Sequence, residues 1–232
     1  MNNLIEIKNL FKEFDGKFAL NNVNLNIESG KIVGLLGPNG SGKTTLIKLL
    51  NKLLVPSGGE LYIDGLAPGI ETKKIVSYLP DKSYLNEWMD AKELINFFSD
   101  FYEDFDSKKA YQMLESLNIS PNDKLKNMSK GTKEKVQLIL VMSRKAKLYL
   151  LDEPIGGVDP ASRDYILKTI INNYSDDSTV IISTHLISDI EKVLDQVIFL
   201  KNGSVVLNGD ADEIREEKGM SIDKLFREEF RC

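Results

Sequence analysis

A glycine-rich stretch, GPNGSGKT, stands between a strand pattern and a helix pattern, and it restricts the fold more than any other feature. It covers residues 37–44 and fits G-x-x-x-x-G-K-[ST]. The run before it, IVGLL, is continuously apolar, as in strands that are buried on both faces. After it, leucine and isoleucine recur at helical spacing over residues 46–54. A strand, a glycine-rich turn and a helix in this order predict an α/β domain with a phosphate-binding loop.

The residue types in this loop suit a nucleotide. Its glycines let backbone N–H groups crowd round phosphate oxygens, and the helix N-terminus adds partial positive charge. We expect Lys43 to reach the β- and γ-phosphates and the Thr44 hydroxyl to bind Mg²⁺. A loop of this kind alone does not separate a kinase, a GTPase and a mechanical ATPase.

Strand and helix patterns alternate along the chain. Strands are predicted at residues 23–27, 75–79, 148–151, 180–183 and 197–200, the last closed into a hairpin by Asn202 and Gly203. Residues 81–147 show helix after helix, and one of these opens with Asp90 and Glu93 as a capping pair. Ser129 is a good N-cap for a helix that contains the apolar run VQLILVM. The pattern predicts a helical insert in an α/β core, followed by a short helical tail at residues 210–231.

Two acids and the single histidine follow predicted strands. Asp152 and Glu153 end the apolar strand LYLL, where one carboxylate can hold a metal while the other orients the attacking water. His185 ends the strand VIIST, at the sheet edge where ligands of open α/β sheets collect. A lone histidine is usually structural, but this position favours a contact to the γ-phosphate.

Composition limits the partners and the compartment. Lys and Arg number 30 against 35 Asp and Glu, which gives a net charge of −5 and a pI of about 5.2, so a nucleic-acid partner is disfavoured. The only cysteine is Cys232, which suits a reducing compartment. The start MNNLIEIKNL has no signal-peptide pattern, and no apolar run is long enough to span a membrane. We expect a cytoplasmic protein whose membrane function, if it has one, comes from a partner.

Together these motifs resemble the nucleotide-binding subunit of an ATP-binding cassette (ABC) transporter. The resemblance runs from LFKEFDGKFALNNVNLNIESGKIVGLLGPNGSGKTT through LYLLDEPIGGVDP and IISTH to LKNGSVVLNGD. It implies a P-loop NTPase core with a mostly parallel sheet, an N-terminal antiparallel β-subdomain and an inserted α-helical subdomain. We expect one ABC ATPase domain over residues 1–232, with its core at 1–80 and 146–209, its helical subdomain at about 81–145 and its tail at 210–232.

The resemblance also implies roles for single residues. Asp152 is then the Walker B aspartate that holds Mg²⁺, Glu153 the catalytic base and His185 the switch histidine. Phe14 lies where an aromatic ring stacks on adenine, although it could equally be a core phenylalanine. The residues implied in binding ATP through the Walker A motif are Gly37, Pro38, Asn39, Gly40, Ser41, Gly42, Lys43, Thr44 and Thr45.

The segment NMSKGTKEK falls where the family carries its signature loop, usually written L-S-G-G-Q. The serine and the second glycine are kept as Ser129 and Gly131, while Lys130 and Thr132 depart from the pattern. In the family this loop and the D-loop aspartate, here Asp159, act across a head-to-tail dimer on the nucleotide of the opposite chain. Lys130 brings strain only if its position needs a positive φ angle.

A second departure is Asp81, which follows the strand VSYLP where the family usually carries glutamine. We expect Asp81 to keep the link between the site and a membrane partner, with an altered contact to the metal. Beyond it, Tyr84, Leu85, Trp88 and Met89 lie near the groove where family members receive a helix of the transmembrane subunit. The alternative is that some of them pack the helical insert against the core.

Three function classes follow from these features. The leading one is an ATP-hydrolysing subunit that works as a dimer with itself or with a paralogous cassette and drives a transmembrane permease from the inner face of the membrane. The second is a soluble ABC ATPase in repair or cofactor assembly. The third is a P-loop kinase or GTPase, which would have no use for the serine loop, GGVDP and IISTH in this order.

Overall fold

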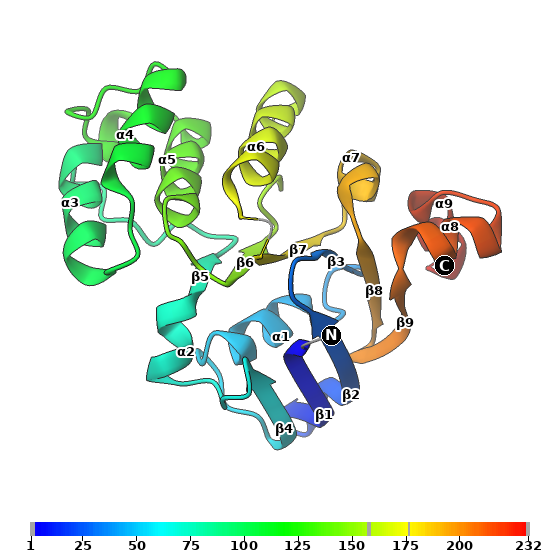
Figure 1. Ribbon diagram of the computed structural model, residues 1–232. Helices are drawn as coiled ribbons and strands as arrows, with labels where there is room; N and C mark the ends of the chain where they lie inside the picture. The colour runs from blue at the N-terminus through cyan, green and yellow to red at the C-terminus, as the bar shows by residue number, and fades with distance from the viewer. Residues whose placement is uncertain (1–2, 157–158, 176, 231–232) are drawn as a thin grey trace.

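The structure is a computed structural model that describes residues 3–156, 159–175 and 177–230. Its centre is a six-stranded sheet with the strand order β5-β6-β7-β3-β8-β9 (Figure 1). All neighbouring pairs are parallel except β8 and β9, which form an antiparallel hairpin through Asn202 and Gly203, both with positive φ. The strands are β3 (Ile32–Leu36), β5 (Val76–Leu79), β6 (Leu148–Asp152), β7 (Thr179–Thr184), β8 (Gln196–Lys201) and β9 (Ser204–Asp210).

A second, antiparallel sheet has the order β2-β1-β4. Its strands are β1 (Asn3–Phe14), β2 (Lys17–Glu28) and β4 (Gly58–Ile63). The predicted strand at residues 23–27 lies inside β2, where Val23, Leu25 and Ile27 are buried and the asparagines between them are exposed. The two sheets confirm the predicted α/β fold class, with a mostly parallel sheet and a separate antiparallel one.

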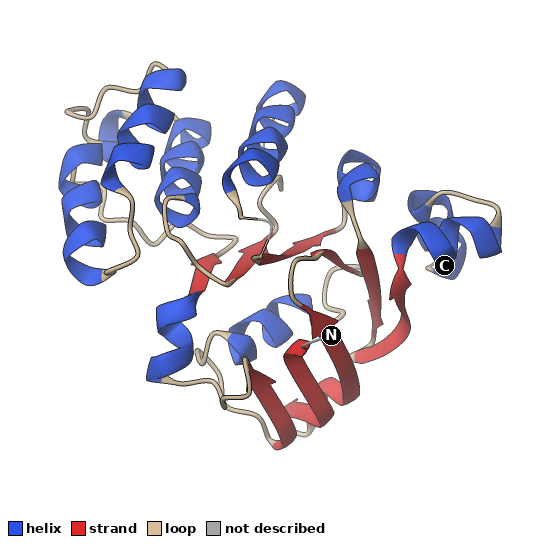
Figure 2. Ribbon diagram, viewed as in Figure 1, coloured by secondary structure: helices blue, strands red, loops and turns tan. Residues whose placement is uncertain are grey.

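The helices lie on both faces of the main sheet. In Figure 2, the antiparallel sheet lies below it together with the helices at residues 43–50 and 70–75, and most other helices lie above it. The helices are α1 (Lys43–Leu50), α2 (Ile70–Ile75), α3 (Ala91–Phe101), α4 (Ser107–Ser116), α5 (Lys130–Met142), α6 (Pro160–Asn173), α7 (Ile187–Ile190), α8 (Ala211–Lys218) and α9 (Ile222–Glu229), with 3-10 turns at Leu125–Asn127 and Glu191–Val193. We call α3, α4 and α5 together the helical insert; it lies beside β5, at the opposite edge of the sheet from α8 and α9.

Two apolar cores sit on the two faces of the main sheet. Strand β3 contributes Val33 and Leu35 to the core that holds α1 and the antiparallel sheet, and Ile32 and Leu36 to the core that holds α5, α6 and α7. Every residue of β3 is buried, as the continuous apolar run predicted. The phosphate-binding loop therefore grows out of a strand that both cores hold in place.

The first helix is shorter than its sequence pattern predicted. Residues 46–54 repeat apolar residues at helical spacing, but α1 ends at Leu50. Lys52 has φ 54°, and the N–H groups of Leu53 and Leu54 both bond to the carbonyl of Lys48, as at a helix C-terminus closed by a left-handed residue. Leu54 still packs on the core, so its burial there does not require a helix.

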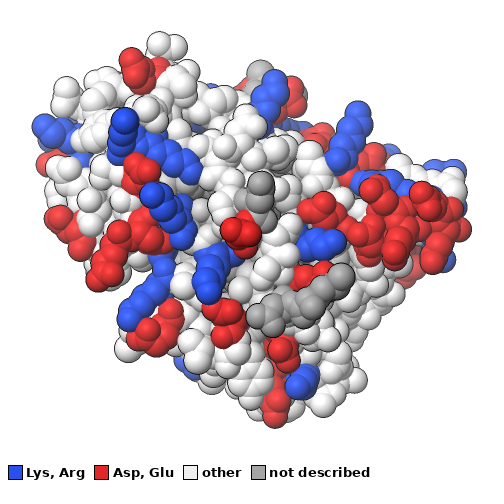
Figure 3. Space-filling model, in the orientation of Figure 1, with Lys and Arg blue, Asp and Glu red and all other residues white. Residues whose placement is uncertain are grey.

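Charge is unevenly spread over one face of the molecule. In Figure 3, acidic side chains gather over the C-terminal helices α8 and α9, while Lys and Arg are interspersed with Asp and Glu elsewhere on this face. No helix among the described residues combines the length and the apolar character that crossing a bilayer requires.

Candidate nucleotide-binding site

The glycine-rich loop lines a cavity of about 240 Å³ between β3 and α1. Gly42, the N-cap of α1, has φ 110°, and a Cβ atom there would lie 2.5 Å from the carbonyl oxygen of Ala19. Glycine is therefore required at this position by both conformation and space. The residues that line the cavity are Ala19, Asn39, Gly40, Ser41, Gly42, Lys43, Thr44, Thr45, Asp81 and Glu153.

Lys43 is almost fully buried and is held by the loop that it serves. Its Nζ donates hydrogen bonds to the carbonyl oxygens of Gly37, at 2.8 Å, and Pro38, at 3.3 Å, and lies 3.7 Å from Glu153 Oε1. Burial lowers the pKa of Lys43, and the charges of Glu153 and Asp152 oppose this shift. A phosphate would supply the negative charge that this ammonium group otherwise takes from Glu153.

Asp152 lies at the end of β6 with one of its two carboxylate oxygens unpaired. Its Oδ1 accepts hydrogen bonds from Ser183 Oγ, at 2.5 Å, and from Thr44 Oγ1, at 3.2 Å. Its Oδ2 is buried without a hydrogen-bond partner among the described residues. Burial raises the pKa of Asp152, which means that the charge lacks full compensation within the chain.

The donor set at this point fits Mg²⁺. A free carboxylate oxygen lies beside a threonine hydroxyl, and both are hard oxygen ligands. In the described part of the chain, no group of three or more His, Cys, Asp or Glu side chains could hold a metal ion. A magnesium ion here would take its remaining ligands from water and phosphate, as is usual for this ion.

Glu153 adopts an unusual backbone conformation that turns it toward the cavity. Its φ is 51°, and its N–H donates to the carbonyl and the hydroxyl of Ser183. Its Oε2 lies 3.0 Å from His185 Nδ1. A left-handed non-glycine residue costs on the order of 1 kcal/mol or more and persists where the surroundings fix it, often at functional sites. Three residues predicted from sequence, Glu153, His185 and Lys43, thus meet at one sheet edge.

Comparisons with known proteins agree with this geometry. The sequence pattern described as "ABC transporter" matches residues 20–156, which is more than half of the chain. The chain belongs to the ABC transporter family. It is 31% identical to the ABC transporter ATP-binding protein YtrB of Bacillus subtilis, over 92% of this chain and 74% of YtrB. It is also 31% identical to the SkfA peptide export ATP-binding protein SkfE of Bacillus subtilis, over 88% of this chain and 87% of SkfE.

Solved cassettes share the fold over most of their length. One is an ATP-binding subunit of an ABC transporter with a TM-score of 0.87, 28% identity and coverage of 97% of this chain and 98% of that chain. Another is MJ0796, a bacterial ABC transporter cassette solved as a dimer, with a TM-score of 0.78, 25% identity and coverage of 89% and 98%. The chain is therefore an ATP-binding subunit of the ABC transporter family, and the kinase and GTPase alternatives are wrong.

The segment predicted to be the signature loop forms the N-cap and first turn of α5. Ser129 is its N-cap, as predicted: its Oγ accepts a hydrogen bond from the Thr132 N–H at 3.2 Å and lies 2.8 Å from the Thr132 hydroxyl. Lys130 is helical, does not have a positive φ and therefore adds no strain. Neither Ser129 nor Gly131 lines the cavity of the cassette's own phosphate loop.

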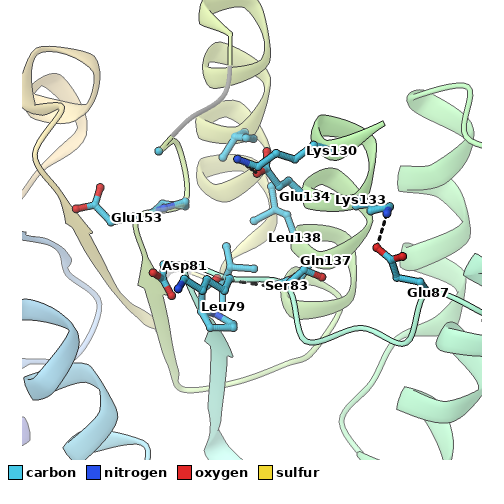
Figure 4. Close-up of a pocket in the computed structure, with 15 residues that line it drawn as sticks. Leu79, Asp81, Ser83, Glu87, Lys130, Lys133, Glu134, Gln137, Leu138 and Glu153 are labelled. Carbon is cyan, nitrogen blue, oxygen red and sulfur yellow. Dashed lines mark hydrogen bonds and ion pairs between the residues drawn. The ribbon is translucent and has the colours of Figure 1, made fainter. Parts of the chain in front are cut away.

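Asp81 lies between two cavities. It lines the phosphate-loop cavity and a larger one of about 390 Å³, which Glu153, Lys130 and Glu134 also line. Figure 4 shows Lys130 and Glu134 on α5 across this second cavity from Asp81. One Glu134 carboxylate oxygen is buried without a partner among the described residues, and burial raises its pKa. The structure places Asp81 between the nucleotide cavity and the helical insert.

The remaining predicted residues have separate outcomes. Phe14, at the end of β1, is 44% exposed with the Lys12 ammonium 4.8 Å from its ring centroid, so the alternative of a core phenylalanine is wrong. Asp159 is exposed just before α6, whereas Gly157 and Val158 of the same predicted loop lie outside the described residues.

The four residues predicted to lie near a partner groove, Tyr84, Leu85, Trp88 and Met89, divide into two pairs. Tyr84 and Trp88 are 52% and 64% exposed, while Met89 is buried and Leu85 packs against the core of the helical insert. The partner surface stays a prediction for Tyr84 and Trp88. It is wrong for Met89, which is a core residue. The alternation of exposed and buried side chains in a loop has no period that sequence reasoning can use.

Ser183 is a site residue that the sequence-based prediction missed. It is fully buried in β7 and binds both Asp152 Oδ1 and the Glu153 N–H. The signal in the sequence was a hydroxyl directly after the apolar run at residues 180–182, in the strand that follows the acidic pair along the chain. A polar residue inside a buried strand needs a partner, and here the partner is the carboxylate of Asp152.

Proposed function

We propose that this cassette hydrolyses ATP with bound Mg²⁺ and, as a head-to-tail dimer, drives a separate transmembrane subunit. The observation that carries the proposal is the Glu153 carboxylate, held 3.0 Å from His185 and 3.7 Å from Lys43 at the edge of the phosphate-loop cavity. A carboxylate at that point can accept a proton from water that attacks a terminal phosphate.

ATP would bind along residues 37–45. The backbone N–H groups of the loop and Lys43 would face its β- and γ-phosphates, and the exposed ring of Phe14 would stack on adenine in place of its contact with Lys12. Thr44 and Asp152 would hold Mg²⁺, with Asp81 close enough to line the same cavity. Mg²⁺ supplies charge neutralisation on the phosphate oxygens.

Hydrolysis would depend on how this chain fixes Glu153. The Glu153 N–H donates to the carbonyl and the hydroxyl of Ser183, which fixes its backbone, and the contact with His185 orients its carboxylate. When the γ-phosphate pairs with Lys43, the Glu153 carboxylate is released from its contact with that ammonium group and is available to accept a proton from water. His185, nearly half exposed, can then contact the γ-phosphate as well as Glu153.

The dimer is supported by a glycine with no role within one chain. Gly131 does not have a positive φ, and a Cβ atom built on it meets nothing within 4 Å. Glycine in the first turn of α5 costs stability relative to alanine, so its benefit must lie outside the monomer. We infer that Ser129, Lys130, Gly131 and Asp159 complete the nucleotide site of a second cassette, in keeping with the dimeric form of MJ0796.

A transmembrane partner is supported by the names of the relatives. YtrB is named as an ABC transporter protein and SkfE as a peptide export protein. Tyr84 and Trp88, exposed in the loop between Asp81 and α3, offer an aromatic surface of the kind found at protein interfaces. We place the cassette at the cytoplasmic face of the membrane through this partner.

The test is the variant Glu153→Gln. It should bind ATP with wild-type affinity and hydrolyse it on the order of 100 times more slowly. With ATP and Mg²⁺ it should accumulate as a dimer in gel filtration. Hydrolysis at the wild-type rate by this variant would overturn the role of Glu153. Tight ATP binding without dimer formation would overturn the dimer and leave the nucleotide site standing.

A further inference from the structure

Arg144 is a buried arginine that none of the ATP-binding motifs contains. It follows α5 by two residues and is only 3% exposed. A guanidinium group is rarely buried unless its donors are paired, and this one has partners in two different parts of the fold. Its contacts therefore indicate what the chain gains from a buried charge.

One set of partners belongs to the helical insert. Arg144 Nε and Nη2 donate to the two carboxylate oxygens of Asp104, at 2.9 and 3.1 Å, in a bidentate pair. The guanidinium carbon lies 3.9 Å from the ring centroid of Tyr102, which fits a cation–π contact. Tyr102 and Asp104 lie in the connection between α3 and α4.

The other set belongs to the core, where α2 leads into β5. Nη1 donates to the carbonyl of Val76 at 2.6 Å, and Nη2 to that of Lys74 at 2.7 Å. The carbonyls of the last turn of a helix lack partners within the helix and carry partial negative charge, so a cation is favoured there. Arginine suits this position because its planar fork can satisfy a carboxylate and two carbonyls at once, which a lysine cannot do.

The same joint ties α5 to β5 along their length. Ser77 Oγ donates to the carbonyl of Val141 at 2.9 Å, and Gln137 Nε2 donates to the carbonyl of Pro80 at 3.4 Å. At one end of this pair of elements is Arg144; at the other, β5 leads to Asp81 and α5 begins after Ser129. At this second end, Asp81 beyond β5 and Lys130 of α5 both line the cavity of about 390 Å³ in Figure 4.

We propose that Arg144 is a positioning residue that joins the helical insert to β5, and thereby fixes where Ser129 and Gly131 stand relative to Asp81. The inference rests on the proposed function, in which Ser129 and Gly131 act on the nucleotide of a second cassette. Arg144 touches no part of the nucleotide cavity, so it acts on the reaction only through the placement of α5.

The test uses Arg144→Lys in the full-length chain, with Glu153→Gln as background where dimers are measured. The variant should bind ATP within about twofold of wild type, because the phosphate loop is intact, while its ATP-driven dimer should be about tenfold weaker. A second readout is the distance between spin labels at Lys108, on α4, and Glu60, on β4, with Cys232 replaced by Ser. Its distribution should be broader in Arg144→Lys.

Two controls separate positioning from general loss of stability. Ile95→Val weakens the core of the insert at a residue of α3 that is not among the partners of Arg144, and should leave the label distances and the dimer affinity unchanged. Arg227→Lys makes the same chemical change at an exposed ion pair with Asp223. If Arg144→Lys does not fold, Asp104→Asn keeps the carbonyl contacts, weakens the charge pair and should show smaller changes in the same two readouts.

Dimer affinity and label distances equal to those of the parent protein would overturn the proposal. So would changes no larger than those of Ile95→Val. If Glu153→Gln alone forms no dimer, the proposed function fails, and the width of the label distribution still decides whether Arg144 fixes the insert.

Discussion

Replacing Gly131 with alanine should separate folding from activity in this cassette. Residue 131 is the second residue of α5, does not have a positive φ and has open space where a methyl group would stand. Alanine loses less backbone entropy than glycine on entering a helix, so the folded monomer should gain about 0.5 to 1 kcal/mol. For a chain of this size, that corresponds to a rise in melting temperature of roughly 1 to 4 °C.

Activity should move the other way. In the proposed dimer the bare Gly131 backbone approaches the phosphate of the opposite chain, and a methyl group would push the two apart. Loss of even one or two charge-assisted hydrogen bonds in the transition state lowers the rate by roughly 10- to 1,000-fold. ATP hydrolysis by Gly131→Ala should fall within that range, while ATP binding to the monomer should be unchanged.

The assays are calorimetric melting without nucleotide, steady-state phosphate release and nucleotide binding by fluorescence. Gly69→Ala is the matched control, since Gly69 has an extended backbone and its added methyl group would meet only an ordinary contact at 3.7 Å. It should hydrolyse ATP at the wild-type rate. Wild-type hydrolysis by Gly131→Ala would refute the signature role of α5. A lower melting temperature would refute the conclusion that a methyl group fits at residue 131.

Substitutions at four further positions test single parts of the site. Asp152→Asn should lower ATP hydrolysis on the order of 100-fold and remove its response to Mg²⁺, with no loss of melting temperature, because burial already penalises the charged carboxylate; a melting temperature several degrees lower would contradict this. Phe14→Ala should weaken ATP binding by about 1 to 3 kcal/mol with kcat unchanged, whereas Phe18→Ala, another exposed aromatic of the same sheet, should leave affinity as it is. Asp81→Gln and Asp81→Ala should both shift the Mg²⁺ dependence of hydrolysis, and unchanged values in both would remove Asp81 from the metal site. Burial raises the pKa of Glu134, so the stability that its carboxyl contributes is fully present below its unfolded pKa and is lost as pH rises through its folded pKa. Glu134→Gln should therefore be more stable than wild type at pH 8 and equally stable near pH 3, and a constant difference across that range would be against it.

Local patterns predicted most of the elements that carry the site. Strand β3 was predictable because a strand that is buried on both faces consists of consecutive non-polar residues. The N-caps Asp90 and Ser129 were predictable because their hydrogen-bond partners lie three residues further along the chain. The end of α1 was not, because Leu53 and Leu54 continue the helical period after Lys52 has left the helix. A left-handed lysine has no sequence signal comparable to glycine.

Contacts between distant segments limited what could be predicted of the site. Ser183 lies 31 residues from Asp152, and Arg144 lies 40 residues from Asp104, so neither pair shows in any local spacing. The left-handed backbone of Glu153 follows from bonds that cross from β6 to β7. Such residues are fixed by the packed sheet, and only the structure reveals which polar side chains the sheet brings together.

The central claim, that each nucleotide site is completed by a second chain, can be tested by mixing two inactive variants. Lys43→Ala removes the ammonium group of the phosphate loop, and Ser129→Ala removes the hydroxyl that caps α5. In a mixed dimer one site carries both defects and the other carries neither. With random pairing in a two-fold dimer, half of the dimers are mixed and each has one intact site of two. A 1:1 mixture should therefore recover about a quarter of wild-type ATP hydrolysis. A mixture that stays as inactive as its two components would contradict it.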